Sequence, residues 1–453
     1  SLKPREDRLV MSALMDFDAV GSMTGARFTA GVICSAERMT YTNVNKVLEG
    51  DPEMTARYAA LAPHFRVMKE FALVLNARRA ERGSIDFDLP EPVIEFDEEQ
   101  RISSIVRSER NIAHRLIEEF MLAANRAVAS HLLQRGLASL HRVHEKPDAK
   151  KVIEFEELAR AFGCTLGVEN LVEQRLPVRH GRVPAPARPG RPDTLGHGRE
   201  RPMFAALPGT GDLKITPGHY QRLVHKLAGK PEERILSYLM LRSLKQARYA
   251  ADSLGHFALA FAEYTHFTSP IRRYPDLIVH RVLKWALEHP SEVIGPHKSH
   301  GANPPADASP YRRDVLEEIA TESSEAERRA ETAERELMSW KTAQFMESRL
   351  GDEFDALVIS VQKFGFFVEL LEIFVEGLVP INVLEEALGA RCVYRDRDHA
   401  IVALLDSGRG RGRADSSRRG GPRQLMWRLG DRVRVRAERI DPIRRRVEFA
   451  LVE

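Results

Sequence analysis

Residues 266–281 read HFTSPIRRYPDLIVHR and combine a turn, two adjacent arginines and the start of an apolar helix. A Ser-Pro pair marks a turn before a helix, and Ser269 could cap that helix. The apolar residues that follow predict a helix over 274–288. Arg272 and Arg273 would then lie at the positive end of the helix dipole, where a phosphate binds favourably. The segment predicts an anion site; the alternative is a capped helix whose arginines pair with nearby acids.

The composition around this segment is that of a folded protein. The 453 residues are 43% hydrophobic, 29% charged and 7% aromatic, which suits a soluble globular protein and excludes global disorder. Every apolar run is far shorter than the ~18 residues that cross a bilayer, so no membrane partner is expected. Cys34, Cys164 and Cys392 are too far apart in sequence for a disulfide framework or a paired metal motif, which indicates a reducing, cytoplasmic location.

The distribution of charge is more informative than the net charge of +3. Basic residues crowd 175–201 and 409–446, and such stripes are typical of a surface that binds a polyanion. The alternative is an arginine-rich surface that is merely solvated. Within these stripes we predict an Arg/Pro-rich insertion at about 175–210 and a basic low-complexity loop at about 407–424.

The first part of the chain mixes strand and helix patterns. Residues 28–35 and 38–44 predict strands with a tight connection, and 52–82 predicts a helix. Residues 86–96 alternate and are interrupted by prolines, as in an extended or edge segment. Apolar residues over 111–133 recur at spacings of three and four, which predicts a helix with one buried face.

Two further helical regions follow, at 217–250 and 311–350. In the second, small and apolar residues form a narrow seam at alternating spacings of four and three. The seam could serve a partner coiled coil, but its small residues favour packing on the same chain. It consists of Ala326, Ala330, Ala333, Leu337 and Trp340.

The last hundred residues change to short strands separated by turns, with a pair of aromatic residues expected at the surface. This pattern predicts a small β-barrel of the OB type. The expected strands cover residues 354–361, 364–370, 376–380, 432–440 and 446–452.

The 266–281 segment closely resembles the signature of the ribonuclease II / ribonuclease R (RNB) family, and leans towards the ribonuclease R type. The last hundred residues resemble the S1-type RNA-binding domain that follows RNB. The resemblance implies an α+β fold, with an RNB domain over 1–349 and an S1-type OB-fold barrel over 350–453. Other family-like segments occur in family order: RMTYTNV (38–44), NIAHRLIEEFM (111–121), HEKP (144–147) and AERRA (326–330).

The family comprises processive 3′→5′ exoribonucleases that hydrolyse single-stranded RNA to nucleoside 5′-monophosphates with Mg²⁺. By resemblance, Arg272 is the catalytic arginine that contacts the scissile phosphate. Tyr41 matches the tyrosine that holds the 3′-terminal nucleotide, and Phe87 the aromatic residue that stacks on terminal bases. Glu118 matches a carboxylate near the terminal ribose, where hydroxyl recognition separates RNA from DNA. The alternatives are a core tyrosine, a packing phenylalanine and an ordinary helix carboxylate.

In the barrel, the resemblance assigns RNA contacts to two aromatic and two basic residues. Phe364 and Phe367 match positions that stack on nucleobases, a contact worth ~1–3 kcal/mol per base. Arg445 and Arg446 are expected to contact phosphates. With Phe366 between them, at least one of the three phenylalanines must belong to the core.

The chain departs from the family pattern at the metal site. The family's D-x-x-x-x-x-D-x-D-D quartet, whose carboxylates hold two metal ions, is absent from the sequence. Asp16 and Asp18 lie too close to Tyr41 to replace it and are expected to sit on a strand and its turn. We therefore expect no metal ligand in this chain, and expect the quartet and the cold-shock domains upstream of Ser1. The chain would then be N-terminally truncated and inactive. A monomer is expected.

Other function classes are less well supported. The rival hypothesis is a non-catalytic RNA-binding protein with a degenerate RNB fold. His256, His266 and His280 lack the HExxH spacing of a zinc hydrolase, so core or capping roles are expected for them. The absence of a GxxxxGK[ST] loop disfavours an ATP-driven helicase.

Overall fold

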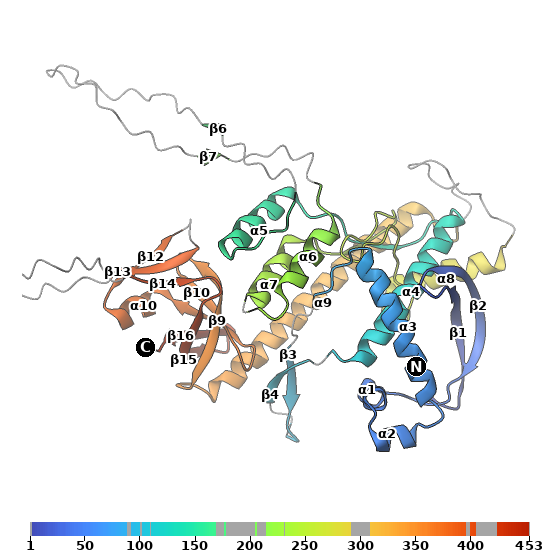
Figure 1. The fold of residues 1–453 in the computed structure, drawn as a ribbon, viewed down its shortest axis with the longest axis horizontal. Helices are drawn as coiled ribbons and strands as arrows, with labels where there is room; N and C mark the ends of the chain where they lie inside the picture. The colour runs from blue at the N-terminus through green and yellow to red at the C-terminus, as the bar shows by residue number, and fades with distance from the viewer. Residues whose placement is uncertain are drawn as a thin grey trace, which may run out of the picture.

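The structure is a computed structural model in which a mixed N-terminal body and a C-terminal β-barrel are joined by one long helix (Figure 1). The predicted 175–210 insertion and 407–424 loop lie almost entirely outside the described residues. Two short strands, β6 (Leu176–Pro177) and β7 (Phe204–Ala205), are exceptions. The described residues are 2–87, 92–99, 102–108, 110–168, 176–177, 204–205, 214–230, 232–290, 309–395, 399–404 and 424–452.

The N-terminal body is built on α4 (Ile112–Gln134), which confirms the helix predicted over 111–133. The Asn111 side chain caps it by accepting hydrogen bonds from the backbone N–H groups of Ala113 and His114. Its buried residues pack in one cluster with α8 (Tyr274–Glu288), whose bounds match the predicted helix. The hairpin of β1 (Asp7–Phe17) and β2 (Met23–Cys34) lies against the same cluster.

Two predictions in the first hundred residues are wrong. Residues 38–44 do not form a strand, because α1 (Tyr41–Glu49) begins there with Thr40 accepting a hydrogen bond from the backbone of Asn43. The predicted 52–82 helix is two helices, α2 (Pro52–Arg57) and α3 (Ala62–Glu81). Proline in the first turn of α3 lacks an N–H group, which suits a helix start and interrupts a continuous helix.

A layer of three helices forms a second cluster around fully buried Tyr220 and Leu236. The helical prediction over 217–250 is therefore correct for two helices, but its end is strand β8, which pairs with β5. These elements are α5 (Ala149–Ala161), α6 (Pro217–Leu227), α7 (Glu233–Ser243), β5 (His141–Val143) and β8 (Arg248–Ala250).

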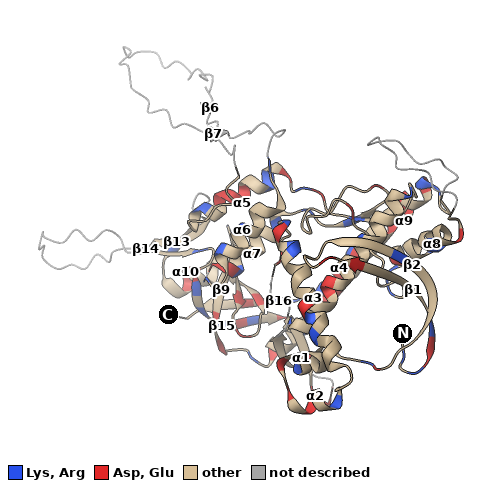
Figure 2. Ribbon diagram, turned by 45° about the vertical axis from the view of Figure 1, so that its right-hand side comes forward, with Lys and Arg blue, Asp and Glu red and all other residues tan. Residues whose placement is uncertain are grey.

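The long helix α9 (Arg313–Glu347) connects the body to the barrel. Its buried residues lie near its two ends, at Leu316 and Ala320 and again at Phe345 and Met346. The predicted seam is exposed: Leu337 is 54% and Trp340 39% accessible. Packing of the seam on the same chain is contradicted, because the middle of α9 spans the distance between the two bodies. Charged residues of both signs lie along this exposed length (Figure 2).

The C-terminal strands close into a barrel in the order β10-β11-β16-β15-β9, as predicted. Its core contains fully buried Phe366 and Phe449. Gly365 has φ +149°, and a Cβ there would lie 2.3 Å from the carbonyl oxygen of Val379, so only glycine fits. The barrel strands are β9 (Glu353–Gln362), β10 (Gly365–Leu370), β11 (Glu376–Pro380), β15 (Arg432–Asp441) and β16 (Arg446–Leu451).

The barrel carries additions on its surface. A helix follows β11, and a separate three-stranded antiparallel sheet lies beside it. A two-stranded hairpin between α3 and α4 also packs against the barrel's cluster, and its first strand lies in the predicted extended segment. These elements are α10 (Ile381–Leu388), β12 (Arg391–Arg395), β13 (Ala400–Leu404), β14 (Gln424–Arg428), β3 (Pro92–Phe96) and β4 (Ile102–Arg107). Among the described residues, no helix is long and apolar enough to span a bilayer.

Candidate nucleic-acid interface

One face of α4 brings predicted nucleotide-binding residues together. Tyr41, at the start of α1, is 46% exposed, which contradicts the alternative of a core tyrosine. Its ring stacks on His114, with centroids 4.0 Å apart and planes 25° apart. His114 and Glu118 are four residues apart on α4 and therefore share a face. The face offers an aromatic platform next to a carboxylate.

Glu118 is joined through Arg110 to the loop that carries Phe87. Arg110 donates to Glu118 at 2.6 Å and to Asp86 at 2.9 Å. Burial lowers the pKa of Arg110, but the hydrogen bonds and charges of the two carboxylates outweigh it and raise that pKa. Burial likewise raises the pKa of Asp86, yet Arg110 and Arg79 hold it below its ordinary value. Both shifts keep Arg110 and Asp86 charged at neutral pH.

Phe87 follows Asp86 and packs, partly buried, against the cluster formed by α5, α6 and α7. This position fits the packing alternative, and a stacking role for Phe87 stays a prediction.

A buried ion pair beneath this face was not predicted from the sequence. Arg79 on α3 and Glu119 on α4 are each 4% exposed, and Arg79 Nε donates to Glu119 Oε1 at 2.9 Å. Arg79 also bonds Ser84 at 3.1 Å and Asp86 at 3.4 Å. The pair locks α3 to α4 and holds the Asp86 loop. The sequence did contain a signal for this pair. Arg79 lies four residues after Leu75 and Glu119 three residues after Leu116, so each charge stands where the helical period predicts a buried apolar residue.

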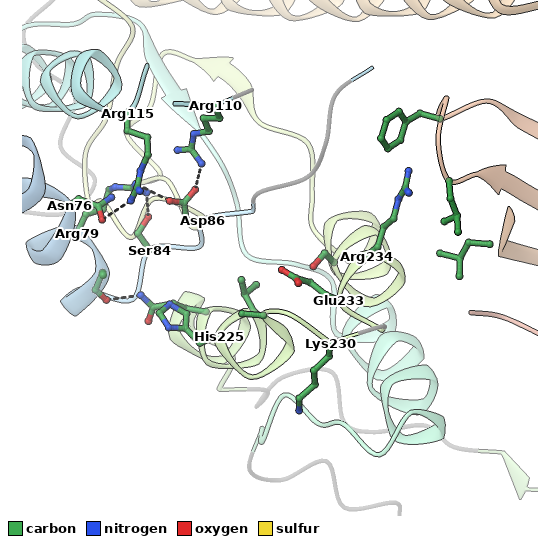
Figure 3. A pocket seen from close by; sticks show the side chains of 18 of the residues that line it. Asn76, Arg79, Ser84, Asp86, Arg110, Arg115, His225, Lys230, Glu233 and Arg234 are labelled. Atoms are coloured by element: carbon green, nitrogen blue, oxygen red, sulfur yellow. Dashed lines mark hydrogen bonds and ion pairs between the residues drawn. The ribbon is translucent and has the colours of Figure 1, made fainter. Parts of the chain in front are cut away.

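A cavity of about 940 Å³ opens beside this cluster, between the N-terminal body and the barrel (Figure 3). Arg110 and Asp86 line one wall, and Arg432 of β15 belongs to the other. Arg234 of α7 ties the two sides together by pairing with Glu369 of β10. Lysine and arginine outnumber acids in the lining, which suits an anionic chain. The charged lining residues are Arg79, Arg110, Arg115, Lys230, Arg234 and Arg432, with Asp86 and Glu233.

The loop before α8 presents one of its two arginines. Ser269 does not cap the helix, because α8 begins only at Tyr274 and buried Asp276 accepts from the Ser269 backbone N–H at 2.8 Å. Arg273 pairs with the same carboxylate at 2.7 Å, so it matches the acid-paired alternative. Arg272 is exposed, and no acid within the described part of the chain pairs with it. The two-arginine anion site is wrong in that form, and Arg272 alone remains available.

The Arg272 loop is fixed to the same helix that carries Glu118. Asn125 on α4 accepts from the backbone N–H of Phe267 at 2.9 Å and donates to Tyr264 at 3.0 Å. Glu118 and Asn125 are seven residues apart and so share a side of α4. One rigid element therefore positions both the nucleotide-binding face and the loop of the predicted catalytic arginine.

In the barrel, the three phenylalanines separate as expected. Phe366 is fully buried, whereas Phe364 is 54% exposed in the turn before β10. Phe364 and Phe367 meet edge to face with centroids 6.1 Å apart. Arg445 is held by Glu336 of α9 at 2.6 Å, while Arg446 is exposed at the start of β16. RNA contact by these four residues stays a prediction.

The described residues do not fit a magnesium site. Among them, no three His, Cys, Asp or Glu side chains gather as a metal would require. Asp18 caps a turn by accepting from the backbone of Val20 and Ser22, as expected. Partial burial lowers the pKa of His256 to about 3 and of His266 to about 2, so both imidazoles are neutral at neutral pH.

Known families account for this architecture. The RNB domain model matches residues 1–289. The chain belongs to the RNB family. A second model, the S1 RNA binding domain, matches residues 347–408, so the RNB-then-S1 order expected from the sequence is confirmed. This order explains why an α+β body is followed by a closed five-stranded barrel.

Similar curated proteins are named ribonuclease R. The chain is 36% identical over 453 residues to "Ribonuclease R" of Aquifex aeolicus, covering 100% of this chain and 53% of that protein. It is 32% identical to "Ribonuclease R" of Escherichia coli, covering 100% of this chain and 47% of that protein. The RNB chain therefore spans about half the length of the curated relatives that it matches.

Solved structures share the fold at lower identity. The apo form of Mycoplasma genitalium RNase R superposes with a TM-score of 0.73 at 23% identity, covering 100% of this chain and 59% of that one. The same protein in complex with ribose-methylated single-stranded RNA gives a TM-score of 0.72, also at 23% identity and with the same coverage of both chains. Yeast Ssd1, described as a pseudonuclease, gives 0.57 at 18% identity, covering 89% of this chain and 42% of that one.

Proposed function

We propose that this chain provides the RNA-binding surface of a 3′→5′ exoribonuclease that degrades single-stranded RNA to nucleoside 5′-monophosphates. One observation carries the proposal: the Tyr41–His114 stack lies one helical turn from Glu118, and Arg110, which pairs with Glu118, lines a basic cavity whose far wall belongs to the S1 barrel. An RNA chain bound there would have its 3′ end held by the RNB body and its preceding nucleotides held by the barrel.

The chemistry of each group suits this task. The exposed Tyr41 ring, stacked on His114, extends an aromatic surface on which a terminal base can stack. The Glu118 carboxylate can accept a hydrogen bond from a ribose hydroxyl, which DNA lacks at the 2′ position. Exposed Arg272, anchored through its loop to α4, can stabilise charge on a phosphate. None of these contacts depends on base identity, so the binding would be sequence-tolerant.

The relatives support RNA as the ligand and exonuclease action as the reaction of the complete protein. Mycoplasma genitalium RNase R has been solved with single-stranded and with double-stranded RNA. Mg²⁺ would supply the water-activating centre, but the described residues of this chain form no site for it, so we derive no step through it. We further propose a cytoplasmic monomer, consistent with the free thiols of Cys34, Cys164 and Cys392.

Binding of a single-stranded oligoribonucleotide to the purified chain at several salt concentrations tests the proposal. Because phosphate contacts release counterions, the logarithm of the association constant should fall steeply and linearly with the logarithm of the salt concentration. Salt-independent binding, or none, would remove the basis for an RNA-binding surface. In the complete protein, Arg272→Ala should lower turnover much more than RNA affinity, and equal losses would reduce Arg272 to a binding role.

A second candidate is a non-catalytic RNA-binding protein. The observation that favours it is the lack of a carboxylate cluster among the described residues, together with the fold shared with a structure described as a pseudonuclease. Both candidates predict RNA binding by this chain without Mg²⁺-dependent mononucleotide release. The full-length gene product separates them: rapid Mg²⁺-dependent release supports the enzyme, and binding without release supports the non-catalytic protein.

A further inference from the structure

The β3–β4 hairpin leaves the RNB body and packs against the barrel through one face, while most of its other residues are exposed. Ile105 of β4 is 4% exposed and belongs to the same cluster as Phe366 of the barrel and Met346 of α9. Its cross-strand partner Ile94 packs against that cluster, as does Ile102. Figure 1 shows the hairpin between α4 and the C-terminal end of α9. Because an isolated two-stranded hairpin is marginally stable in water, its conformation depends on this packing.

The base of the hairpin is part of the nucleotide-binding cluster. Asp86 precedes β3 and Arg110 follows β4, and the two side chains are joined at 2.9 Å. Arg110 also holds Glu118 at 2.6 Å. The barrel therefore holds the hairpin at Ile94, Ile102 and Ile105, while the base of the hairpin places the guanidinium that contacts Glu118.

We propose that the β3–β4 hairpin is a positioning element through which the S1 barrel sets the place of Arg110 and Asp86, with Ile105 as the residue that seats it. The inference rests on the proposed function, since it assigns a role to the same RNA-binding cluster. Ile105 touches no nucleotide: it acts through Arg110. Loss of its packing frees the hairpin and lets the Arg110–Glu118 contact loosen.

The test compares Ile105→Ala with Val93→Ala on the same hairpin, where Val93 is 44% exposed. Affinity for a single-stranded oligoribonucleotide with a free 3′ end should fall roughly tenfold in Ile105→Ala, the scale of one weakened charge-assisted contact, and stay unchanged in Val93→Ala. Ile105→Val should retain the wild-type affinity. Ile94→Ala serves as a second variant if Ile105→Ala fails to fold. Wild-type affinity in a folded Ile105→Ala or Ile94→Ala chain would overturn the inference.

A double-mutant cycle separates positioning from a general loss of structure. In an Arg110→Ala background, Ile105→Ala should cause no further loss of affinity, because the group through which it acts is gone. Additive losses would contradict action through Arg110.

A second readout needs no RNA. The pKa of the Asp86 carboxyl, followed by NMR titration, should rise in Ile105→Ala and not in Val93→Ala, because Arg110 holds it low. An unchanged Asp86 pKa overturns the inference. A wild-type chain that binds no RNA instead overturns the proposed function.

Discussion

The buried Arg79–Glu119 pair should be the most sensitive polar feature of the RNB body. Both side chains are almost fully removed from water, and Asn76 also donates to Glu119 at 2.8 Å. Arg79→Ala leaves the Glu119 carboxylate buried without its cation. Removing one member of a buried ion pair lowers the free energy of unfolding by about 3–5 kcal/mol. The neighbouring Arg78 provides a matched control, since its pair with Glu81 is exposed and contributes about 0–1 kcal/mol.

Urea unfolding followed by circular dichroism measures both variants. We expect the free energy of unfolding to drop by several kcal/mol in Arg79→Ala and to change little in Arg78→Ala. Because Arg79 also bonds Ser84 and Asp86, RNA affinity should weaken in the first variant as well. Replacing both members, as Arg79→Met with Glu119→Leu, should recover much of the lost stability. An Arg79→Ala variant as stable as Arg78→Ala would refute the assignment of the pair as a buried lock.

Three further predictions address the rings proposed to contact RNA, the barrel core and two partly buried histidines. Tyr41→Ala should weaken binding of a single-stranded RNA by ~1–3 kcal/mol in fluorescence anisotropy, while Tyr41→Phe, which keeps the ring, should not; equal losses would place the effect in the hydroxyl group. Phe366→Ala should destabilise the barrel by about 3–5 kcal/mol in thermal or urea unfolding, whereas Phe364→Ala should leave stability unchanged and weaken RNA binding; the reverse order would contradict the core assignment. Because burial keeps His256 and His266 neutral in the folded chain, with pKa values lowered to about 3 and about 2, the unfolded chain takes up protons that the folded chain does not. The free energy of unfolding should therefore be highest above about pH 6.5. Below that pH it should fall by up to about 1.4 kcal/mol per pH unit for each histidine. A free energy of unfolding that stays constant between about pH 6.5 and 4 would contradict the lowered pKa values.

The fold was predictable where periodicity is local and uninterrupted. The helix over 111–133 and the one over 274–288 are present, and the closing strands of the barrel fall where alternation places them. Residues 38–44 show the limit: a β-rich local pattern gave way to a helix because Thr40 caps it and Val47 is buried against α3. The seam of α9 failed for another reason, since spacing alone does not show whether a partner surface exists.

The candidate site was predictable only as separate residues. Resemblance supplied Tyr41, Glu118 and Arg272, but nothing in the sequence joins them; the structure does so through one helix, α4. Arg110 and Asp86, which orient the cluster, are ordinary charged residues flanking a hairpin that is more than ten residues long. Their pairing joins residues that are 24 positions apart in the chain, a contact that local patterns do not encode.

The central claim is that this chain holds the 3′ end of single-stranded RNA at Tyr41 and Glu118. The most direct measurement compares its affinity for a linear single-stranded RNA with that for a circular RNA of the same sequence, which has no 3′ end. The linear form should bind roughly tenfold or more tightly, the contribution of one stacked terminal base, and Tyr41→Ala should abolish the difference. Equal affinity for linear and circular RNA would contradict the account.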